Sequence, residues 1–232
     1  MAIKRRLEKK SDDAILDLTE AKFKATSFFE KNQKIILGVL IGLVVVVGGW
    51  FAYNNLVKEP KEQKAMSQMW KAQMQFEQDS LVAALENPGG GYLGFIQIAK
   101  DYSGTKAGNL AKFYAGVAYL NLGNFDEALK YINDFHPAGS VGPNMKYGTL
   151  GDVYSELNQF DKAIENYRKA SNASDNELLT PYYLKKEALL MESQGQVDKA
   201  LEIYRKIKSK YPNSNEALSI EKYIARAEAT SK

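Results

Sequence analysis

Nineteen consecutive residues, 35–53, carry no charge (IILGVLIGLVVVVGGWFAY), whereas charged residues recur throughout the rest of the chain. An α-helix of this length is about 28 Å long, close to the hydrocarbon thickness of a bilayer. Lys34 precedes the segment, and Trp50, Tyr53 and Asn54 lie at its other end, as is typical of a membrane interface. We therefore expect a transmembrane helix at 35–53, with residues 1–34 on one side of the membrane and residues 54–232 on the other.

The basic excess of the chain lies before this segment. Residues 1–34 contain 9 Lys or Arg against 6 Asp or Glu, whereas residues 54–232 contain 22 of each. The positive-inside rule then predicts a cytoplasmic N-terminus, although Lys58, Lys61 and Lys64 reduce the local charge difference. A large domain without a basic surplus is poorly suited to binding phosphates, so no nucleic-acid partner is expected.

The apolar segment reads as an uncleaved signal-anchor. A cleaved signal would have an n-region of 34 residues, and no small-residue cleavage site follows Tyr53. The preceding tail, 1–34, carries a helix-start signal at Ser11-Asp12-Asp13 and then apolar residues at helical spacing. We expect an amphipathic helix there, either contacting lipid or a partner, or serving only as a solvated leader. The chain has no cysteine, which excludes disulfides, thiolate metal sites and a lipoprotein anchor.

Small residues share one face of the expected span. Gly38 and Gly42 form a G-x-x-x-G pair, and Val45 and Gly49 continue the row. Glycines in a row allow another helix to approach closely, which predicts a membrane helix as partner. The alternative is that these glycines merely reflect the general frequency of glycine in transmembrane helices.

The second half of the chain repeats itself with intervals of 35 and 37 residues, a period typical of helix–turn–helix solenoids. The aligned segments are GVAYLNLGNFDEALKYINDF (116–135), GDVYSELNQFDKAIENYRKA (151–170) and ALLMESQGQVDKALEIYRKI (188–207). These segments resemble tetratricopeptide repeats, in which small residues stand where paired helices touch. The matching small residues are Gly116, Gly151 and Ala188 in the first helices and Ala128, Ala163 and Ala200 in the second.

The resemblance implies an all-α fold, in which one N-terminal transmembrane helix is followed by a tetratricopeptide-repeat solenoid. We expect leading helices or a degenerate repeat at 54–107, interrupted by the breaker Asn87-Pro88-Gly89-Gly90-Gly91. Three repeats should follow at 108–213, ended by Pro212. A capping helix and tail should occupy 214–232, because the end of a solenoid otherwise leaves an apolar face wet.

No constellation of catalytic residues is recognisable. The single histidine, His136, lies in a loop beside Pro137 without an acid–base partner suggested by the sequence. The pair Asp126/Glu127 stands at the start of a second helix, where acids are favoured by the helix dipole. Repeated tyrosines such as Tyr167 and Tyr204 fall on positions of the repeat core. We expect neither an enzyme nor a bound cofactor or metal.

Binding is therefore the expected activity, on the concave face that the first helices of such repeats form. The candidate groove residues are Leu110, Phe113, Val117, Leu120, Asn121, Asp152, Tyr182, Lys185 and Leu189. Only Asn121 and Lys185 approach the basic pattern with which chaperone-tail adaptors of this superfamily grip a carboxylate, so an apolar segment or a folded partner is favoured. The alternative for Leu110, Phe113 and Val117 is that they only pack against the helix at 92–102.

The layout as a whole, with a short basic tail, one span and a small repeat domain, resembles the YfgM-like ancillary subunits of the SecYEG translocon. The stretch GFIQIAKDYSGTKAGNLAKFYAGVAYLNLGNFDEAL (94–129) resembles the part of that family that leads into the first repeat. The resemblance implies a bacterial inner-membrane protein with periplasmic repeats. Its implied partners are SecYEG, a periplasmic chaperone of the PpiD type, and nascent secreted or outer-membrane proteins.

Three other hypotheses stay open at this point. The repeats could recruit cell-wall or division proteins as an envelope scaffold. They could instead lie in the cytoplasm, as a receptor on an organelle membrane. An enzyme is the last alternative, without a motif to support it.

Overall fold

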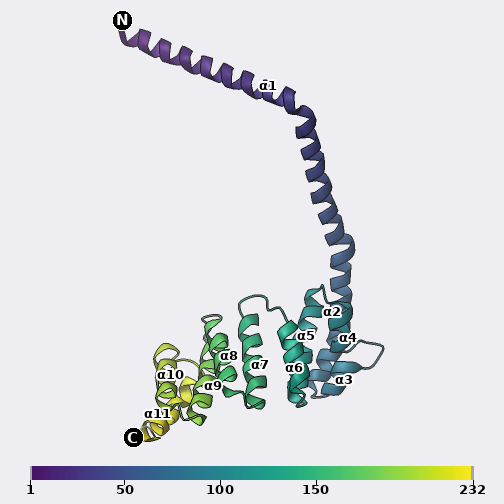
Figure 1. Ribbon diagram of the computed structural model, residues 1–232, viewed down its shortest axis with the longest axis vertical. Helices are drawn as coiled ribbons and strands as arrows, with labels where there is room; N and C mark the ends of the chain where they lie inside the picture. Colours follow the sequence, from purple (N-terminus) through teal and green to yellow (C-terminus); the bar gives the residue numbers. More distant parts are fainter. Residues whose placement is uncertain (1, 231–232) are drawn as a thin grey trace. The chain divides into compact units, whose positions relative to one another are not determined.

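The computed structural model describes the backbone of residues 2–230 and the side chains of residues 22, 24, 26–28 and 30–230. Within these residues the chain is helical, without a strand, and it divides into two units, Met1–Pro60 and Lys61–Lys232. Figure 1 shows the helices in their order along the chain. This confirms the expected all-α solenoid fold with a long apolar N-terminal helix.

The helices have the following bounds. The first unit contains α1 (Ala2–Tyr53) and the π-helical turn η1 (Asn54–Lys58). The second unit, with the boundary helix α2, contains α2 (Glu59–Glu77), α3 (Leu81–Glu86), α4 (Phe95–Asp101), α5 (Lys106–Asn121), α6 (Phe125–Asp134), α7 (Gly142–Glu156), α8 (Phe160–Asn172), α9 (Leu179–Ser193), α10 (Val197–Lys210), the 3₁₀ turn η2 (Ala217–Ser219) and α11 (Ile220–Thr230).

Helix α1 is long and apolar enough to cross a membrane. Of the described residues, only this helical stretch meets that criterion, and none of its most apolar part is buried against the protein. Apart from Ile36, which is half-buried, the large side chains of 35–53 are therefore exposed, unlike those of a core helix in a water-soluble domain. The helix begins at Ala2, so the start expected at Ser11 is wrong. Most side chains of the tail lie outside the described residues, including those of the expected amphipathic face.

Three helix pairs, α5/α6, α7/α8 and α9/α10, occupy the segments in which the repeats were predicted. The aligned alanines Ala128, Ala163 and Ala200 are completely buried, as packing between paired helices requires. Gly116 and Gly151 are equally constrained, because a Cβ on either would lie 2.5 Å from the side chain of Ile132 or Tyr167. The repeat register read from the sequence thus coincides with close contacts between the two helices of a pair.

Each pair turns through a residue with left-handed backbone. Gly123, Asn158 and Gly195 have φ of +74°, +58° and +75°, at equivalent places in the three repeats. Glycine adopts this conformation without steric cost, and asparagine is the side chain that tolerates it best. The residue after each turn, the N-cap of the second helix, also has a similar φ in the three repeats: −91°, −90° and −85°.

The leading part of the second unit packs onto the first repeat. Ala65 and Met69 of α2 are buried in one core with Phe95 of α4 and Ala111 of α5. The carboxylate of Glu62 accepts hydrogen bonds from the backbone N–H groups of Lys106 (2.6 Å) and Ala107 (2.9 Å), at the beginning of α5. Helix α2 is therefore joined to the first repeat by both apolar packing and a helix cap.

The closing helix begins later than expected. The Ser214 side chain accepts a hydrogen bond from the backbone N–H of Ala217 and forms a local turn, and the α-helix α11 starts only at Ile220. Ile220, Ile224 and Ala227 of α11 are buried in the core of the third repeat. Four of its eight remaining positions carry a charge, which suits the solvent-facing side of a solenoid cap.

Candidate interaction surface on the inner helices

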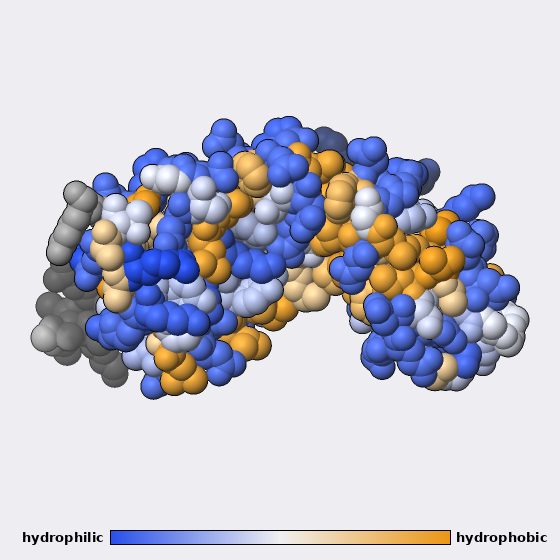
Figure 2. Space-filling view, turned by 90° about the horizontal axis from the view of Figure 1, so that it is seen from below, coloured by the Kyte–Doolittle hydropathy of each residue, from blue (hydrophilic) through white to orange (hydrophobic). Residues whose placement is uncertain are grey.

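Helices α5, α7 and α9 are the first helices of the three repeats and are called the inner helices below. Positions four, seven, eleven and fourteen residues apart lie on one face of a helix. On α5 this face carries Lys106, Leu110, Phe113 and Val117, and the other two predicted groove residues of this helix, Leu120 and Asn121, lie on it or beside it. Figure 2 shows the repeats from the end at which the inner helices stop, with a surface that is hollowed on one side.

The first cavity, the apolar cavity, lies between the beginnings of α5 and α7. It has a volume of about 360 Å³. Its lining combines aromatic and aliphatic side chains with one cation and contains no carboxylate: Lys106, Asn109, Leu110, Phe113, Phe135, Ala138, Val141, Gly142 and Met145. Two of the predicted groove residues, Leu110 and Phe113, are thus brought together here. Phe113 is only 8% exposed and also packs against Phe135, at 5.2 Å between ring centroids.

The wall of the apolar cavity is held by polar contacts. The Asn109 amide donates to the carbonyl oxygen of His136 (2.7 Å), and the His136 backbone N–H donates to the Asn109 side-chain oxygen (2.9 Å). The Lys146 ammonium donates to the carbonyl oxygens of Asn133 and Phe135 at the end of α6. Partial burial of Lys146 lowers its pKa. The loop after α6, which the repeat pattern does not specify, is thereby fixed in place.

The second cavity, the polar cavity, lies where α5 and α7 end. It has a volume of about 550 Å³ and a mixed lining: Leu120, Asn121, Gly123, Phe125, Asp152, Ser155, Glu156, Tyr167 and Lys186. Three predicted groove residues, Leu120, Asn121 and Asp152, come together here. The remaining lining residues on α6, α8 and α9 were not predicted as groove residues.

Asp152 is the centre of a hydrogen-bonded group in the polar cavity. Its Oδ1 accepts from the Tyr167 hydroxyl (2.7 Å) and from the Lys186 ammonium (2.6 Å). The Lys186 ammonium also lies 5.2 Å from the ring centroid of Tyr182. Burial, followed by the nearby Asp152 charge, raises the pKa of Tyr167 well above its usual value. The tyrosine therefore stays a hydrogen-bond donor and ties α8 to α7.

The same positions in the third repeat are covered by α11. The Arg226 guanidinium donates two hydrogen bonds of 2.7 Å to the Glu192 carboxylate, which also accepts from the Tyr204 hydroxyl. The Lys185 ammonium lies 5.1 Å from the ring centroid of Tyr223 on α11. Leu189 packs in the core that α11 shares with α9 and α10. Lys185 and Leu189 thus lie at an internal contact, outside both cavities.

The two other predicted groove residues lie between these regions. Val117 is half-buried in the cluster formed by α5, α6 and α7. Tyr182 is 41% exposed and stacks edge-on against Tyr183. The predicted set therefore divides into two groups that line the cavities, two residues in contact with the cap helix α11 and two residues that line neither cavity.

The glycine face of α1 has no neighbour within the described residues. A Cβ added at Gly38, Gly42 or Gly49 would meet no atom within 4 Å. Packing of this face stays a prediction.

A third cavity, of about 270 Å³, lies between α8, α9 and α10. Its lining includes Arg168 and the carboxylate of Glu187, which are joined at 2.8 Å. The Glu187 side chain is only 3% exposed, and this burial raises its pKa despite the cation beside it. Among the described residues no group of three potential metal ligands is present in this or another part of the fold.

Comparisons with known proteins agree with this architecture. Family models described as tetratricopeptide repeat match residues 110–136, 147–176 and 186–214. The chain therefore contains tetratricopeptide repeats. A search of curated proteins finds no match.

Solved structures give a similar result for the fold. The chain is similar to the crystal structure of a putative kinesin light chain from Podosopora anserina with nearly identical TPR-like repeats, and to a second crystal structure of a variant of that protein. Both have a TM-score of 0.57 and 17% identity and cover 72% of this chain; the first is itself covered to 87% and the variant to 86%. The likeness shows the fold, a repeat solenoid. The tetratricopeptide repeats themselves indicate a protein-interaction module.

Proposed function

We propose that this chain is a membrane-anchored interaction protein at the SecYEG translocon, where it assists periplasmic chaperones of the PpiD type with newly translocated proteins. The observation that carries the proposal is the combination of an exposed apolar helix with a repeat domain whose first two repeats retain open cavities. A binding domain of this kind acts where its anchor places it. The resemblance to YfgM-like subunits supplies the site of action.

The proposed mechanism has two parts. The Gly38, Gly42, Val45 and Gly49 face of α1 packs against a helix of the translocon, and the repeats bind a chaperone or an emerging chain. Tethering raises the effective concentration of the second contact, so that weak binding in the cavities is sufficient. The acids and bases of residues 54–232 balance, which suits a changing set of protein partners.

Purification of the tagged full-length chain from membranes in mild detergent tests this proposal. Mass spectrometry should recover Sec subunits together with an envelope chaperone. Recovery of cell-wall or division proteins alone, with concentration of the chain at the septum, would favour the envelope scaffold instead. A periplasm-active reporter fused after Lys232 should be active, and an inactive fusion would contradict the proposed topology.

The glycine face can be tested separately. Gly42→Ile adds a branched side chain on this face, where no described atom lies within 4 Å, so folding should be unaffected. Recovery of the Sec subunits should fall several-fold, because close helix approach is blocked. Gly48→Ile is the matched control, since Gly48 lies about 100° away from Gly49 on the helix. Equal losses with both variants would contradict a specific packing face.

A further inference from the structure

We propose that the groove between α5 and α7 binds an extended segment of about seven residues with separated charges. The segment carries an acidic group and a large apolar side chain at the Lys106 end of the groove and a basic group at the Glu156 end. This inference rests on the proposed function, because it describes the segment that the repeats would take from a partner protein. It specifies the chemistry of that segment and its placement in the groove.

The two cavities lie along the same two helices, one at the beginnings of α5 and α7 and the other at their ends. Leu110 and Leu120 on α5, and Met145 and Asp152 on α7, belong to the same faces of their helices and line the two cavities in turn. The fifteen helical steps from Lys106 to Asn121 span about 22 Å at 1.5 Å per residue. An extended chain covers about 3.3 Å per residue, so about seven residues reach from one cavity to the other.

The beginning of the groove offers an apolar floor and one cation, while the Glu62 carboxylate nearby is bound to backbone N–H groups of α5 and is not part of the lining. Phe113, Phe135 and Met145 supply the floor, and Lys106 is the one charged residue of the lining. Among the described residues, no ion pair involves the Lys106 side chain. A large apolar side chain with an acidic neighbour fits both features, because it removes apolar surface from water and opposes the charge.

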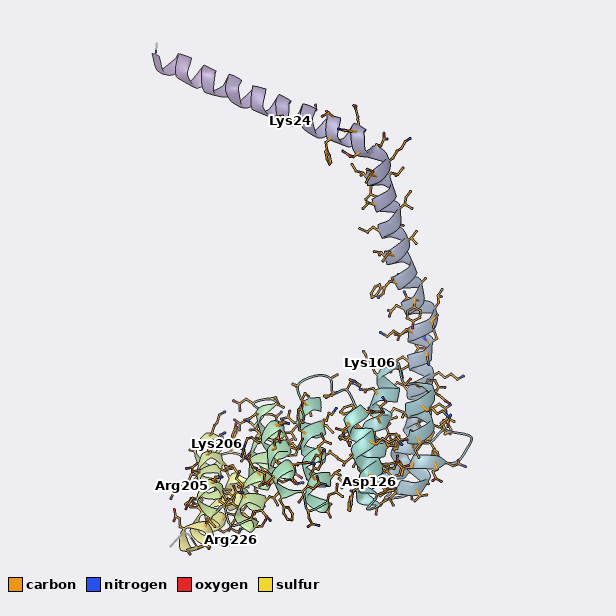
Figure 3. All side chains as sticks on the ribbon, viewed as in Figure 1. Lys24, Lys106, Asp126, Arg205, Lys206 and Arg226 are labelled. Carbon is orange, nitrogen blue, oxygen red and sulfur yellow. The ribbon has the colours of Figure 1, made fainter. Side chains whose placement is uncertain are left out.

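The end of the groove has the opposite charge. The lining carries Asp152, Glu156 and Lys186, and the close pairing of Asp152 with Lys186 leaves Glu156 as the unpaired charge. Asp126, next to the lining residue Phe125, adds a second exposed carboxylate at this end. Figure 3 labels Lys106 and Asp126, which lie at opposite ends of the α5/α6 pair. A lysine or arginine of the bound segment is favoured here.

The third repeat does not extend this groove. The Arg226–Glu192 pair and the packing of Leu189 fill the corresponding face of α9 with α11. The groove therefore ends at the second repeat, which limits the length of the segment. A longer partner would need to leave the surface beside Lys186.

Two fluorescent peptides of identical composition test the charge separation. The probe with separated charges is Asp-Asp-Leu-Phe-Ser-Lys-Lys, and the control is Asp-Lys-Leu-Phe-Ser-Lys-Asp, both with blocked ends. Fluorescence anisotropy is measured with the full chain in detergent micelles at low salt. We expect the first peptide to bind about tenfold more tightly than the control. Only in the first peptide do both acidic residues lie at the Lys106 end of the groove and both lysines at the Glu156 end.

Single variants then assign the ends of the groove. Lys106→Gln should weaken the binding of the first peptide about threefold, because it removes one charge of an exposed pair. Glu156→Lys should weaken it about fivefold, because it reverses one charge of such a pair. Met145→Ala should weaken both peptides about threefold, through lost apolar contact. The controls Lys64→Gln and Glu86→Lys make the same charge changes at exposed residues outside both cavities and should leave binding unchanged.

The outcomes separate this inference from the proposed function. Equal binding of the two peptides, equal effects of the cavity and control variants, or no saturable binding up to about 1 mM would overturn the inference. Recovery of Sec subunits in the purification experiment does not depend on these peptides. Peptide selectivity without any Sec subunit would support the groove while contradicting the translocon assignment.

Discussion

The inner faces of the first two repeats and of the third repeat have similar sequence patterns but different surroundings. Between α5 and α7 this face borders two open cavities. On α9 the corresponding face is covered by α11, through Glu192, Lys185 and Leu189. The difference shows that the repeat motif determines where a residue points, whereas the next element along the chain determines whether it is available to a partner.

The largest effect is expected from the core beneath the covered face. Tyr204 is completely buried, so Tyr204→Ala should lower the free energy of unfolding by about 3–5 kcal/mol. Tyr182 is 41% exposed, so Tyr182→Ala should change the free energy of unfolding by less than about 1 kcal/mol. Urea unfolding followed by circular dichroism measures both. Similar losses for the two variants would mean that the covered and open regions are equally packed.

A second prediction concerns the helix contact beneath the open face. In Gly151→Ala the new methyl would lie 2.5 Å from the Tyr167 ring, which is held by its hydrogen bond to Asp152. The crowding should cost about 1–3 kcal/mol of unfolding free energy. Gly104→Ala, where no atom lies within 4 Å, is the control and should be nearly neutral. A neutral Gly151→Ala would show that the open repeats are loosely packed at their centre.

The contact that closes the third repeat should depend on charge and pH. Glu192→Gln weakens the two hydrogen bonds from Arg226 and should cost about 1–2 kcal/mol, because the arginine is itself partly in water. Those bonds, above all, lower the pKa of Glu192 in the folded protein. Its stabilising contribution is therefore complete above the unfolded pKa of about 4.3 and is lost as pH falls through the lower folded value.

Unfolding free energies between pH 7 and pH 3 check this prediction. The difference between the natural chain and Glu192→Gln should shrink as pH falls below about 4. At pH 7, Glu192→Gln should also accelerate amide hydrogen exchange in α11 more than in α7. A difference that is independent of pH would exclude the carboxylate charge as the cause.

The smallest effect is expected at the turns. Asn158→Gly removes the steric cost of a side chain on a residue with left-handed backbone, but it also increases the conformational freedom of the unfolded chain. We therefore expect the free energy of unfolding to rise by at most about 0.5 kcal/mol. Gly195→Asn, the reverse exchange in the third repeat, should cost a similar amount. Thermal unfolding of both variants measures the pair. A loss larger than about 1 kcal/mol in Asn158→Gly would reveal a contact of the asparagine side chain that stabilises the fold.

The register of the repeats could be predicted because it depends on local and recurrent requirements. Ala128, Ala163 and Ala200 mark places where only small side chains fit, and such places recur whenever the same helix pair is built. The acids of the second helices follow the same logic: Asp126, Asp161 and Asp198 all stand in a first turn. Patterns of this kind can be read from one sequence without knowledge of distant contacts.

The cavities depend on contacts between parts that are distant in the sequence. Val141 enters the apolar cavity from the loop between the first two aligned segments, where it meets Phe135 at the end of the first segment. Lys186 reaches Asp152 across 34 positions. Covering of α9 by α11 was equally hidden, because the sequence does not reveal that Arg226 pairs with Glu192. The start of α11 was misplaced since Ser214, a good capping residue, caps a short turn here instead of the α-helix.

The carboxylate of Glu62 has a consequence for how motion passes through the second unit. The two oxygens of Glu62 accept hydrogen bonds from the first two backbone N–H groups of α5. Ala65 and Met69, which lie on α2 like Glu62, are buried in the core that α2 shares with α5. Sliding or rotation of α2 would break both interactions at once, so no hinge separates α2 from the first repeat. A pull applied to the chain at Lys61 would therefore load the Glu62 contact and the shared core together before α2 could separate from α5.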